Sequence, residues 1–432
     1  MAEVCLEKSH LRVKAIAMNE DFPAATMKPP RRIGRVLVAG SLLAVGLIGF
    51  AGWSQWQESL VPRLREQLKE AAVRGRWQEV GSLSARLTEL APRDGEARMM
   101  RARAAHAQGN PVESARFLSE MPDCPQKQRA LQELAELQLG PLVAPLAAEQ
   151  TYRQMLERDP RSELAHQRLI FLYAITLQRQ ELMHEARQAM ELHCEPVEAF
   201  VYLFLADELP FSNGPELNHR WLSGDPNAEL FKVAEAIQLA TSLKGGVLRD
   251  ELEVVLRMRK LADDKDRALA GLFQRYPDNL ELLAWHIERA IEHGDLDRTV
   301  ELLSRLPARA DADNRFWRFA GWAKAQLGRQ QEALANYNQA LQLHPLDWTT
   351  RHLLAGLRRE QQHFDEVDRL EKIVQTGYEL TLAIYVLPDA RTVPDTLLSR
   401  LADFATECGD ELFASSLRRQ LRPRSDSSGQ DG

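Results

Sequence analysis

The stretch RFWRFAGWAKAQLGRQQEALANYNQALQLHPLDW, residues 315–348, decides the fold of this 432-residue chain. Ala320 and Gly321 share one face of a first predicted helix with Trp317, and their small size lets a second helix approach closely. Gly328 marks the end of that first helix, because glycine readily adopts the left-handed conformation that helix ends often need. The stretch therefore predicts two antiparallel helices joined by a tight turn.

The second helix of this hairpin opens near Gln331 and has its own apolar face. Ala333, Tyr337 and Ala340 follow one another at spacings of four and three residues, which places them on one side of a helix. Pro345 ends the hairpin, because proline cannot continue a helix.

The pattern resembles the tetratricopeptide repeat (TPR), a 34-residue helix–turn–helix unit. The matching positions are Trp317, Gly321, Gly328, Ala333, Tyr337, Ala340 and Pro345. Lys324 departs from the family, which usually has an aromatic residue there. The resemblance implies an all-α solenoid, in which the units stack as a right-handed superhelix and the first helices line a concave binding surface.

The 34-residue period recurs along the chain. Gly294 lies one period before the glycine of the quoted turn, and Gly75 and Gly109 are also one period apart. The resemblance covers most of residues 60–377 and is strongest over 280–345. A helical repeat of another type is the alternative. Repeats of this kind stack because neighbouring hairpins bury apolar faces that one hairpin leaves exposed.

A segment rich in helix breakers divides the array. Residues 209–226 contain Pro210, Gly214, Pro215, Gly224 and Pro226. Such a density predicts an irregular insertion between an N-terminal TPR-like block, 58–208, and a C-terminal TPR block, 227–377. The insertion is either a surface loop without further role or an arm whose aromatic residues, Trp221 among them, contact a partner.

The remainder of the chain is assigned to a cap, a tail and a leader. Residues 378–420 leave the period and predict a helical cap that hides the apolar edge of the last repeat. Residues 421–432 are predominantly polar and predict a disordered tail. Residues 1–32 predict a loose leader.

An uncharged apolar run predicts one transmembrane anchor at 33–57. Residues 36–57 carry no charge, and about 20 apolar residues cross a bilayer. Basic residues precede the run at Lys28, Arg31, Arg32 and Arg35. This bias predicts that 1–32 are cytoplasmic and that the repeats lie outside the cytoplasm, on an inner membrane. A cleaved signal peptide, a buried core helix and the reversed topology are the alternatives.

Charge and motifs exclude several function classes. The net charge of −7 and the pI near 6.0 argue against a nucleic-acid binder, which needs clustered basic residues. Arginine outnumbers lysine 44 to 11, which hints at a GC-rich bacterial genome. The sequence has no H-E-x-x-H, phosphate-loop, G-x-S-x-G or dinucleotide motif. We therefore expect no catalytic residue and no cofactor.

Cysteines and histidines predict no metal site. The four cysteines are Cys5, Cys124, Cys194 and Cys408. Their wide spacing favours free thiols over one long-range disulfide. His184 lies more than two helical turns from His193, so one ion could not bind both on a straight helix.

The resemblance also places candidate partner-binding residues on the concave surface. Carried over from the family's inward positions, they are Arg315, Arg318, Trp322, Gln326, His352 and Arg359. Two arginines beside an aromatic residue suit an acidic or C-terminal peptide. The alternative is that Arg315 and Arg318 pair with glutamates of the preceding unit, such as Glu281. Trp322 stands where the chaperone-tail clamp of the family has asparagine, which argues against that ligand.

The sequence thus predicts a non-catalytic, membrane-anchored scaffold or adaptor that holds a protein or peptide partner in the groove of the solenoid. The alternative is a regulator or enzyme accessory subunit whose site lies in 209–226 or in 378–420.

Overall fold

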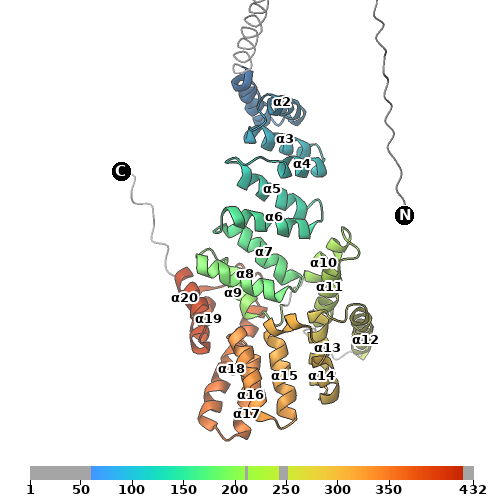
Figure 1. Cartoon of the computed structure of the whole chain (residues 1–432), viewed down its shortest axis with the longest axis vertical. Coiled ribbons are helices and arrows are strands. Elements are labelled where there is room, and N and C mark those ends of the chain that lie inside the picture. Colours follow the sequence, from blue (N-terminus) through green and yellow to red (C-terminus); the bar gives the residue numbers. More distant parts are fainter. Residues whose placement is uncertain (1–59, 210–212, 243–251, 422–432) are drawn as a thin grey trace, which may run out of the picture. The chain divides into compact units, whose positions relative to one another are not determined.

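The computed structural model describes residues 60–209, 213–242 and 252–421. Throughout these ranges the regular elements are helices and no strand occurs, which confirms the all-α class (Figure 1). None of the helices in the described ranges is both long enough and apolar enough to cross a bilayer. The predicted leader 1–32, anchor 33–57 and, apart from Leu421, tail 421–432 lie outside the described residues.

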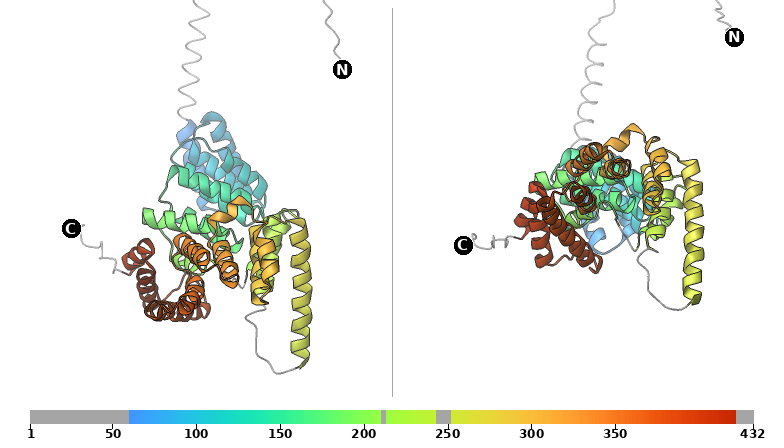
Figure 2. Two further views of the ribbon diagram at one scale, coloured as in Figure 1. Left: turned by 60° about the horizontal axis from the view of Figure 1, so that its bottom comes forward. Right: turned by 90° about the horizontal axis from the view of Figure 1, so that it is seen from below.

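The helices follow one another with short connections. Residues 60–73 are helical, and the labelled helices after them are α2 (Trp77–Leu90), α3 (Gly95–Ala107), α4 (Pro111–Ser119), α5 (Lys127–Leu139), α6 (Pro145–Arg158), α7 (Glu163–Ile175), α8 (Arg179–Leu192), α9 (Val197–Phe204), α10 (Gly214–Leu222), α11 (Glu229–Ser242), α12 (Leu252–Arg275), α13 (Leu280–Glu292), α14 (Leu296–Leu303), the 3₁₀ helix η1 (Ala308–Ala312), α15 (Asn314–Gln326), α16 (Gln330–Leu343), α17 (Trp348–Glu360), α18 (Phe364–Tyr385), α19 (Asp395–Cys408) and α20 (Glu411–Gln420). Consecutive helices pack as hairpins, most extensively α15 with α16 and α17 with α18. The long α12 packs beside α11 and α13 (Figure 2).

The hairpin α15–α16 has the predicted small-to-large contact. A Cβ atom at Gly321 would lie 2.5 Å from Cε1 of the Tyr337 ring, so only glycine allows the two helices this approach. Gly328 follows α15 with φ of 73°, in the left-handed region that glycine occupies without strain. Gly75, Gly109 and Gly294 have φ of 67°, 81° and 69°. The predicted period of glycine turns is confirmed, and the fold is TPR-like.

A second feature with the same period is the cap of each first helix. Asn279, Asp313 and Asp347 are 34 residues apart and precede α13, α15 and α17. Each side chain accepts a hydrogen bond from the backbone N–H of the following turn, as Asp347 does from Thr350 at 2.8 Å. Such caps satisfy N–H groups that have no partner within the helix.

The prediction of an irregular segment at 209–226 is wrong for half of its length. Residues 214–222 form α10, which packs against α11 as a further hairpin. Pro215 lies in the first turn, where its missing N–H removes no helical hydrogen bond. Trp221 is buried, with its ring centroid 5.6 Å from that of Phe231. This ring therefore packs in the core and is not exposed for a partner.

The predicted boundary at 377 and 378 is also wrong, because α18 continues through it to Tyr385. Gly377 does not end the helix. A Cβ atom at this position would lie 2.6 Å from Cγ of Trp348, so the glycine makes room for a tryptophan of α17. After this helix, α19 and α20 are the two helices predicted for the C-terminal segment.

The hairpin α19–α20 packs against helices far earlier in the chain. Phe413 of α20 meets Phe200 of α9 edge to face with ring centroids 5.3 Å apart, and Phe404 of α19 meets Phe204 at 5.6 Å. Asp410, the cap of α20, pairs with Arg187 of α8 at 2.8 Å. The C-terminal segment therefore packs on α8 and α9, not only on the last repeat as predicted.

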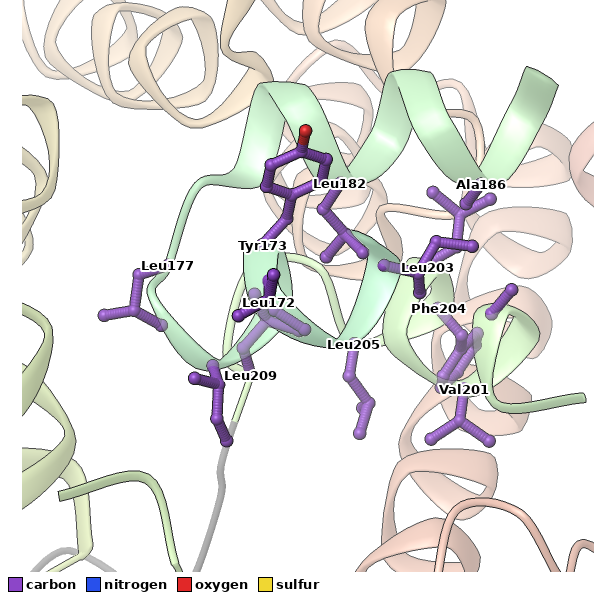
Figure 3. Close-up of a cluster of buried hydrophobic side chains, with 14 of the residues drawn as sticks. Leu172, Tyr173, Leu177, Leu182, Ala186, Val201, Leu203, Phe204, Leu205 and Leu209 are labelled. Carbon is purple, nitrogen blue, oxygen red and sulfur yellow. The ribbon is translucent and has the colours of Figure 1, made fainter. Parts of the chain in front are cut away.

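One hydrophobic core connects these elements. Its buried side chains extend from Leu131 of α5 to Leu417 of α20. Figure 3 shows part of it, where Tyr173 of α7, Leu182 of α8 and Phe204 of α9 belong to the same cluster. Since α8 and α9 contribute to this core from the middle of the chain, they hold the earlier and later hairpins together.

Candidate functional site

A cavity of about 1110 Å³ lies among the helices that share this core. Its walls come from α7, α8, α9, α11, α13, α15 and the end of α18, the residues directly after α9, and the connection from α18 to α19. The charged residues among them are Arg168, Arg179, Glu198, Asp207, Glu208, Glu281, Glu288, Arg315, Arg318, Asp389 and Arg391. The cavity is thus a polar space inside a helical array.

One group of buried charges is centred on Glu281, in the first turn of α13. Its carboxylate accepts from Arg179 Nε at 3.0 Å and from Arg315 Nη2 at 2.6 Å. Arg315 also binds the Asp313 carboxylate at 2.7 Å. Since Glu281 and Arg315 are one 34-residue period apart, equivalent positions on neighbouring first helices face each other. This contact confirms the alternative prediction that Arg315 pairs with a glutamate of the preceding unit.

A second group is centred on Arg318 of α15. Its guanidinium binds Asp347 at 2.7 Å and also contacts Asp207. The Asn314 amide donates to Asp207 and to Asp347, each at 3.1 Å. Arg318 is therefore a single buried cation that joins three elements: its own helix α15, the helix cap before α17 and the turn after α9. Arg318 pairs with these aspartates and not with a glutamate of the preceding unit.

These contacts keep the groups ionised. Burial alone would raise the pKa of Asp207, but the charge and hydrogen bond of Arg318, together with other nearby positive charges, outweigh burial and hold the pKa well below its usual value. The pKa of Glu281 is likewise lowered by Arg179 and Arg315 against the effect of burial. Burial lowers the pKa of His344, which lies near Asp207 and Asp347.

The structure does not bring the six candidate binding residues together. Arg315 and Arg318 line the cavity, and both are buried and neutralised by carboxylates. The other four, Trp322, Gln326, His352 and Arg359, are not part of its wall. Trp322 is half-buried, Gln326 and His352 are exposed, and Arg359 pairs with Glu371. Their role in binding stays a prediction, but the two arginines are not free to hold an acidic peptide.

Three carboxylates of the cavity wall form no ion pair among the described residues. Glu198 is 5% exposed and accepts one hydrogen bond, from the Gln167 amide at 2.6 Å. Glu208 and Glu288 are exposed to the cavity. The cavity therefore has an excess of negative charge.

The remaining wall is largely apolar and aromatic. Phe171 of α7, Tyr202 of α9 and Tyr385 of α18 line it together with Trp285 and Phe319. Tyr385 is 45% exposed, so its ring is open to a ligand. Such surfaces bury the carbon chain of a long side chain and stack on planar groups.

Most of these residues could not be found from the sequence. Asp207 and Glu208 follow α9 without any motif, and the connection from α18 to α19 joins the wall only because α19–α20 packs on α9. The one available signal was the 34-residue spacing, which relates Glu281 to Arg315. No comparable spacing links Asp207 to Arg318, which lie 111 residues apart.

In the ranges that the structure describes, no three His, Cys, Asp or Glu side chains are grouped to hold a metal ion. Cys124, Cys194 and Cys408 are free thiols, and Cys5 lies outside the described residues. Burial raises the pKa of Cys194 to about 11, which keeps this thiol protonated and weakly nucleophilic at neutral pH.

Comparison with known proteins gives one family match. The model of the bacterial transcriptional activator domain matches residues 261–360, from within α12 to the end of α17. Among curated proteins, no sequence matches this chain.

The solved structures that match this chain include the following three proteins. A tetratricopeptide repeat protein from Parabacteroides merdae is 14% identical, with 60% of this chain and 96% of that chain covered and a TM-score of 0.27. Yeast Tom70 is 14% identical, with 84% and 90% covered and a TM-score of 0.24. Human IFIT1, solved as a dimer with PPP-AAAA, is 12% identical, with 84% and 93% covered and a TM-score of 0.29.

Proposed function

We propose that this chain is a non-catalytic interaction protein that holds a segment of a partner protein in the cavity between α9, α13 and α15. The observation that carries this proposal is the cavity itself, about 1110 Å³ in a TPR-like array with both polar and aromatic walls. Concave sites with a few convergent polar groups are typical binding sites. The volume suits several side chains of an extended segment and not a whole domain.

The buried ion pairs support this proposal by fixing the walls. Arg179, Arg315 and Arg318 join helices that are far apart in the sequence, and their partners leave little freedom for rearrangement. A preformed wall lowers the ordering cost of binding. The cavity is therefore suited to recognition of one segment geometry.

We propose further that residues 33–57 anchor the chain in the inner membrane, with 1–32 in the cytoplasm and the helical array outside it. The uncharged run and the preceding basic residues support this arrangement. Fusing alkaline phosphatase or green fluorescent protein after residue 421 tests it. Active phosphatase and dark fluorescent protein are expected, whereas the reverse result would place the array in the cytoplasm.

A second candidate function follows from the match of residues 261–360 to the bacterial transcriptional activator domain. The array would then serve as the partner-sensing part of a regulator, and the connection from α18 to α19 would belong to its site. This candidate uses the same cavity but requires the array to share a compartment with a transcription complex. The fusion experiment therefore separates the two candidates.

The test of the cavity uses a photo-crosslinking amino acid, p-benzoylphenylalanine, at two tyrosines of α18. Tyr385 lines the cavity, whereas Tyr378 does not, and their exposures are similar at 45% and 49%. The full-length chain is irradiated in the cell that produces it, and crosslinked peptides are identified by mass spectrometry. We expect one defined partner segment attached at position 385 and not at 378. Equal crosslinking at both positions, or none at 385, would contradict the cavity as the binding site.

A further inference from the structure

The charge balance of the cavity identifies the chemistry of its occupant. All five arginines of the wall have carboxylate partners. Beyond the three already described, Arg168 pairs with Glu136 at 3.0 Å, and Arg391 pairs with Asp389 at 2.6 Å. An acidic ligand would have to displace one of these carboxylates. The cavity is thus poorly suited to the acidic peptide that the sequence suggests.

The carboxylates that form no ion pair among the described residues favour a basic ligand. Glu198 is nine-tenths buried, and among the described residues it accepts one hydrogen bond, from a neutral amide. A buried carboxylate without an ion-pair partner is costly. Glu208 and Glu288 add two more negative groups to the lining of the same cavity, and Glu288 is close enough to Glu208 to raise its pKa. A cation placed beside Glu208 and Glu288 would gain favourable interactions with both.

The environment of Glu208 supports the same conclusion. Although this side chain is exposed to the cavity, the surrounding protein partly desolvates it. This desolvation and the negative charges of Asp207 and Glu288 raise its pKa. The local potential is therefore negative even after the nearby arginines have been taken into account.

The shape of the wall distinguishes between kinds of cation. Among the described residues no cluster of acidic or histidine side chains is close enough to hold a metal ion. Tyr202, Phe171 and Tyr385 instead offer apolar and aromatic surface beside the carboxylates. A guanidinium or ammonium group on a long carbon chain uses both features, by ion pairing at its end and by packing along its stem.

We infer that the cavity binds a partner segment through an arginine or lysine side chain, which Glu208 and Glu288 receive in a cavity that Glu198 also lines. This inference rests on the proposed function and names the chemistry of the partner. It replaces the acidic ligand expected from Arg315 and Arg318 with a basic one.

The test uses three fluorescein-labelled peptides of equal length that differ only in two central residues, Arg, Gln or Glu. Binding to the full-length chain is followed by fluorescence anisotropy. We expect the Arg peptide to bind about tenfold more tightly than the Gln peptide, and the Glu peptide to bind most weakly. Higher salt should weaken the Arg peptide selectively.

Substitutions of the acidic residues test whether Glu208 and Glu288 cause the preference for the Arg peptide. Glu208→Gln with Glu288→Gln should lower the affinity for the Arg peptide to that for the Gln peptide. The matched control is Glu157→Gln with Glu191→Gln, two exposed glutamates outside the cavity wall, which should leave all three affinities unchanged. Glu288→Lys should reverse the preference in favour of the Glu peptide. Unchanged urea midpoints verify that these exposed substitutions preserve the fold.

The outcomes separate this inference from the proposed function. If the Glu peptide binds as well as the Arg peptide, if the Arg peptide fails to bind at about 1 mM, or if the cavity substitutions leave the preference intact, the basic ligand is excluded. Crosslinking of a partner segment at Tyr385 would still uphold the cavity as a binding site. Loss of that crosslink alone would reject the cavity itself.

Discussion

The hairpin α15–α16 and the hairpin α19–α20 have the same local form and different means of support. The first joins its helices by a small-to-large contact, Gly321 against Tyr337, between residues 16 positions apart. The second packs on α8 and α9 through Phe413, Phe404 and Asp410, about 200 residues from their partners. The regular hairpin is stabilised by contacts between residues close in sequence. The C-terminal hairpin, in contrast, depends on contacts with helices about 200 residues earlier in the chain.

This difference predicts two kinds of response to mutation. Damage within one repeat should remain local, because each unit contacts mainly the next. Mutations at the contacts of α19–α20 with α8 and α9 should release the C-terminal hairpin. The connection from α18 to α19, which forms part of the cavity wall, should then be released with it.

The largest effect is expected from Phe413→Ala. This fully buried ring contacts Phe200 edge to face, and its removal should lower the free energy of unfolding by about 4 kcal/mol. Hydrogen exchange should rise in α19–α20 and remain near its original level in α15–α16. The control, Phe364→Ala, removes a ring that is 59% exposed and should change stability by less than about 0.5 kcal/mol. Equal exchange in both hairpins would remove the distinction drawn here.

Arg318→Met tests the buried charges of the cavity wall. Asp207 and Asp347 would lose their shared cation while remaining buried, so the free energy of unfolding should fall by about 3 kcal/mol. Arg359→Met removes an exposed partner of Glu371 and should cost less than about 1 kcal/mol. Urea unfolding followed by circular dichroism measures both. Similar midpoints for the two variants would show that the ion pairs of Arg318 do not stabilise the cavity wall.

Gly321→Ala tests the local contact of the regular repeat. The new methyl group would lie 2.5 Å from the Tyr337 ring, and the resulting overpacking should cost about 1–2 kcal/mol despite the better helix propensity of alanine. Gly356→Ala is the matched control, because nothing lies within 4 Å of a Cβ atom there. It should be neutral or stabilising by up to about 1 kcal/mol. A stabilised Gly321→Ala would mean that the two helices separate easily.

The smallest effect concerns pH. Both ring nitrogens of buried His166 face oxygen atoms, Nδ1 at 2.6 Å from Glu185 and Nε2 at 2.9 Å from Pro160. Burial opposes the charged ring, but the hydrogen bonds to Glu185 and Pro160 and the negative charges of Glu185 and Asp159 together outweigh burial and raise the pKa. This stability is therefore complete below the unfolded-state pKa, about 6.5, and is lost as pH rises through the folded-state pKa.

The urea midpoint of the natural chain should thus fall between pH 6 and pH 8 relative to that of His166→Gln. The comparison with the variant cancels the contributions of other titrating groups, such as His344. A difference between the two proteins that does not change with pH would show that the pKa of His166 is the same in the folded and unfolded states.

The helical repeats are predictable from the sequence, but the residues that line the cavity are not. Gly328, Gly321 and Tyr337 act over one hairpin, so their spacing carries the structural information directly. Pro215 is predicted to break a helix, but a proline in a first turn interrupts nothing. Gly377 likewise lies within α18, opposite the ring of Trp348. Whether such a residue ends a helix depends on what packs against it.

The sequence by itself determined the all-α class, the 34-residue hairpin and its glycine turns, because helical periodicity and backbone conformation are local properties. Only the tertiary structure decided that Arg315 and Arg318 are neutralised and that α19–α20 closes on α8 and α9. It also placed Glu198, Glu208 and Glu288, which form no ion pair among the described residues, in the lining of one cavity. The pairing of a charge depends on distances between residues far apart in the chain, and local spacing does not specify those distances.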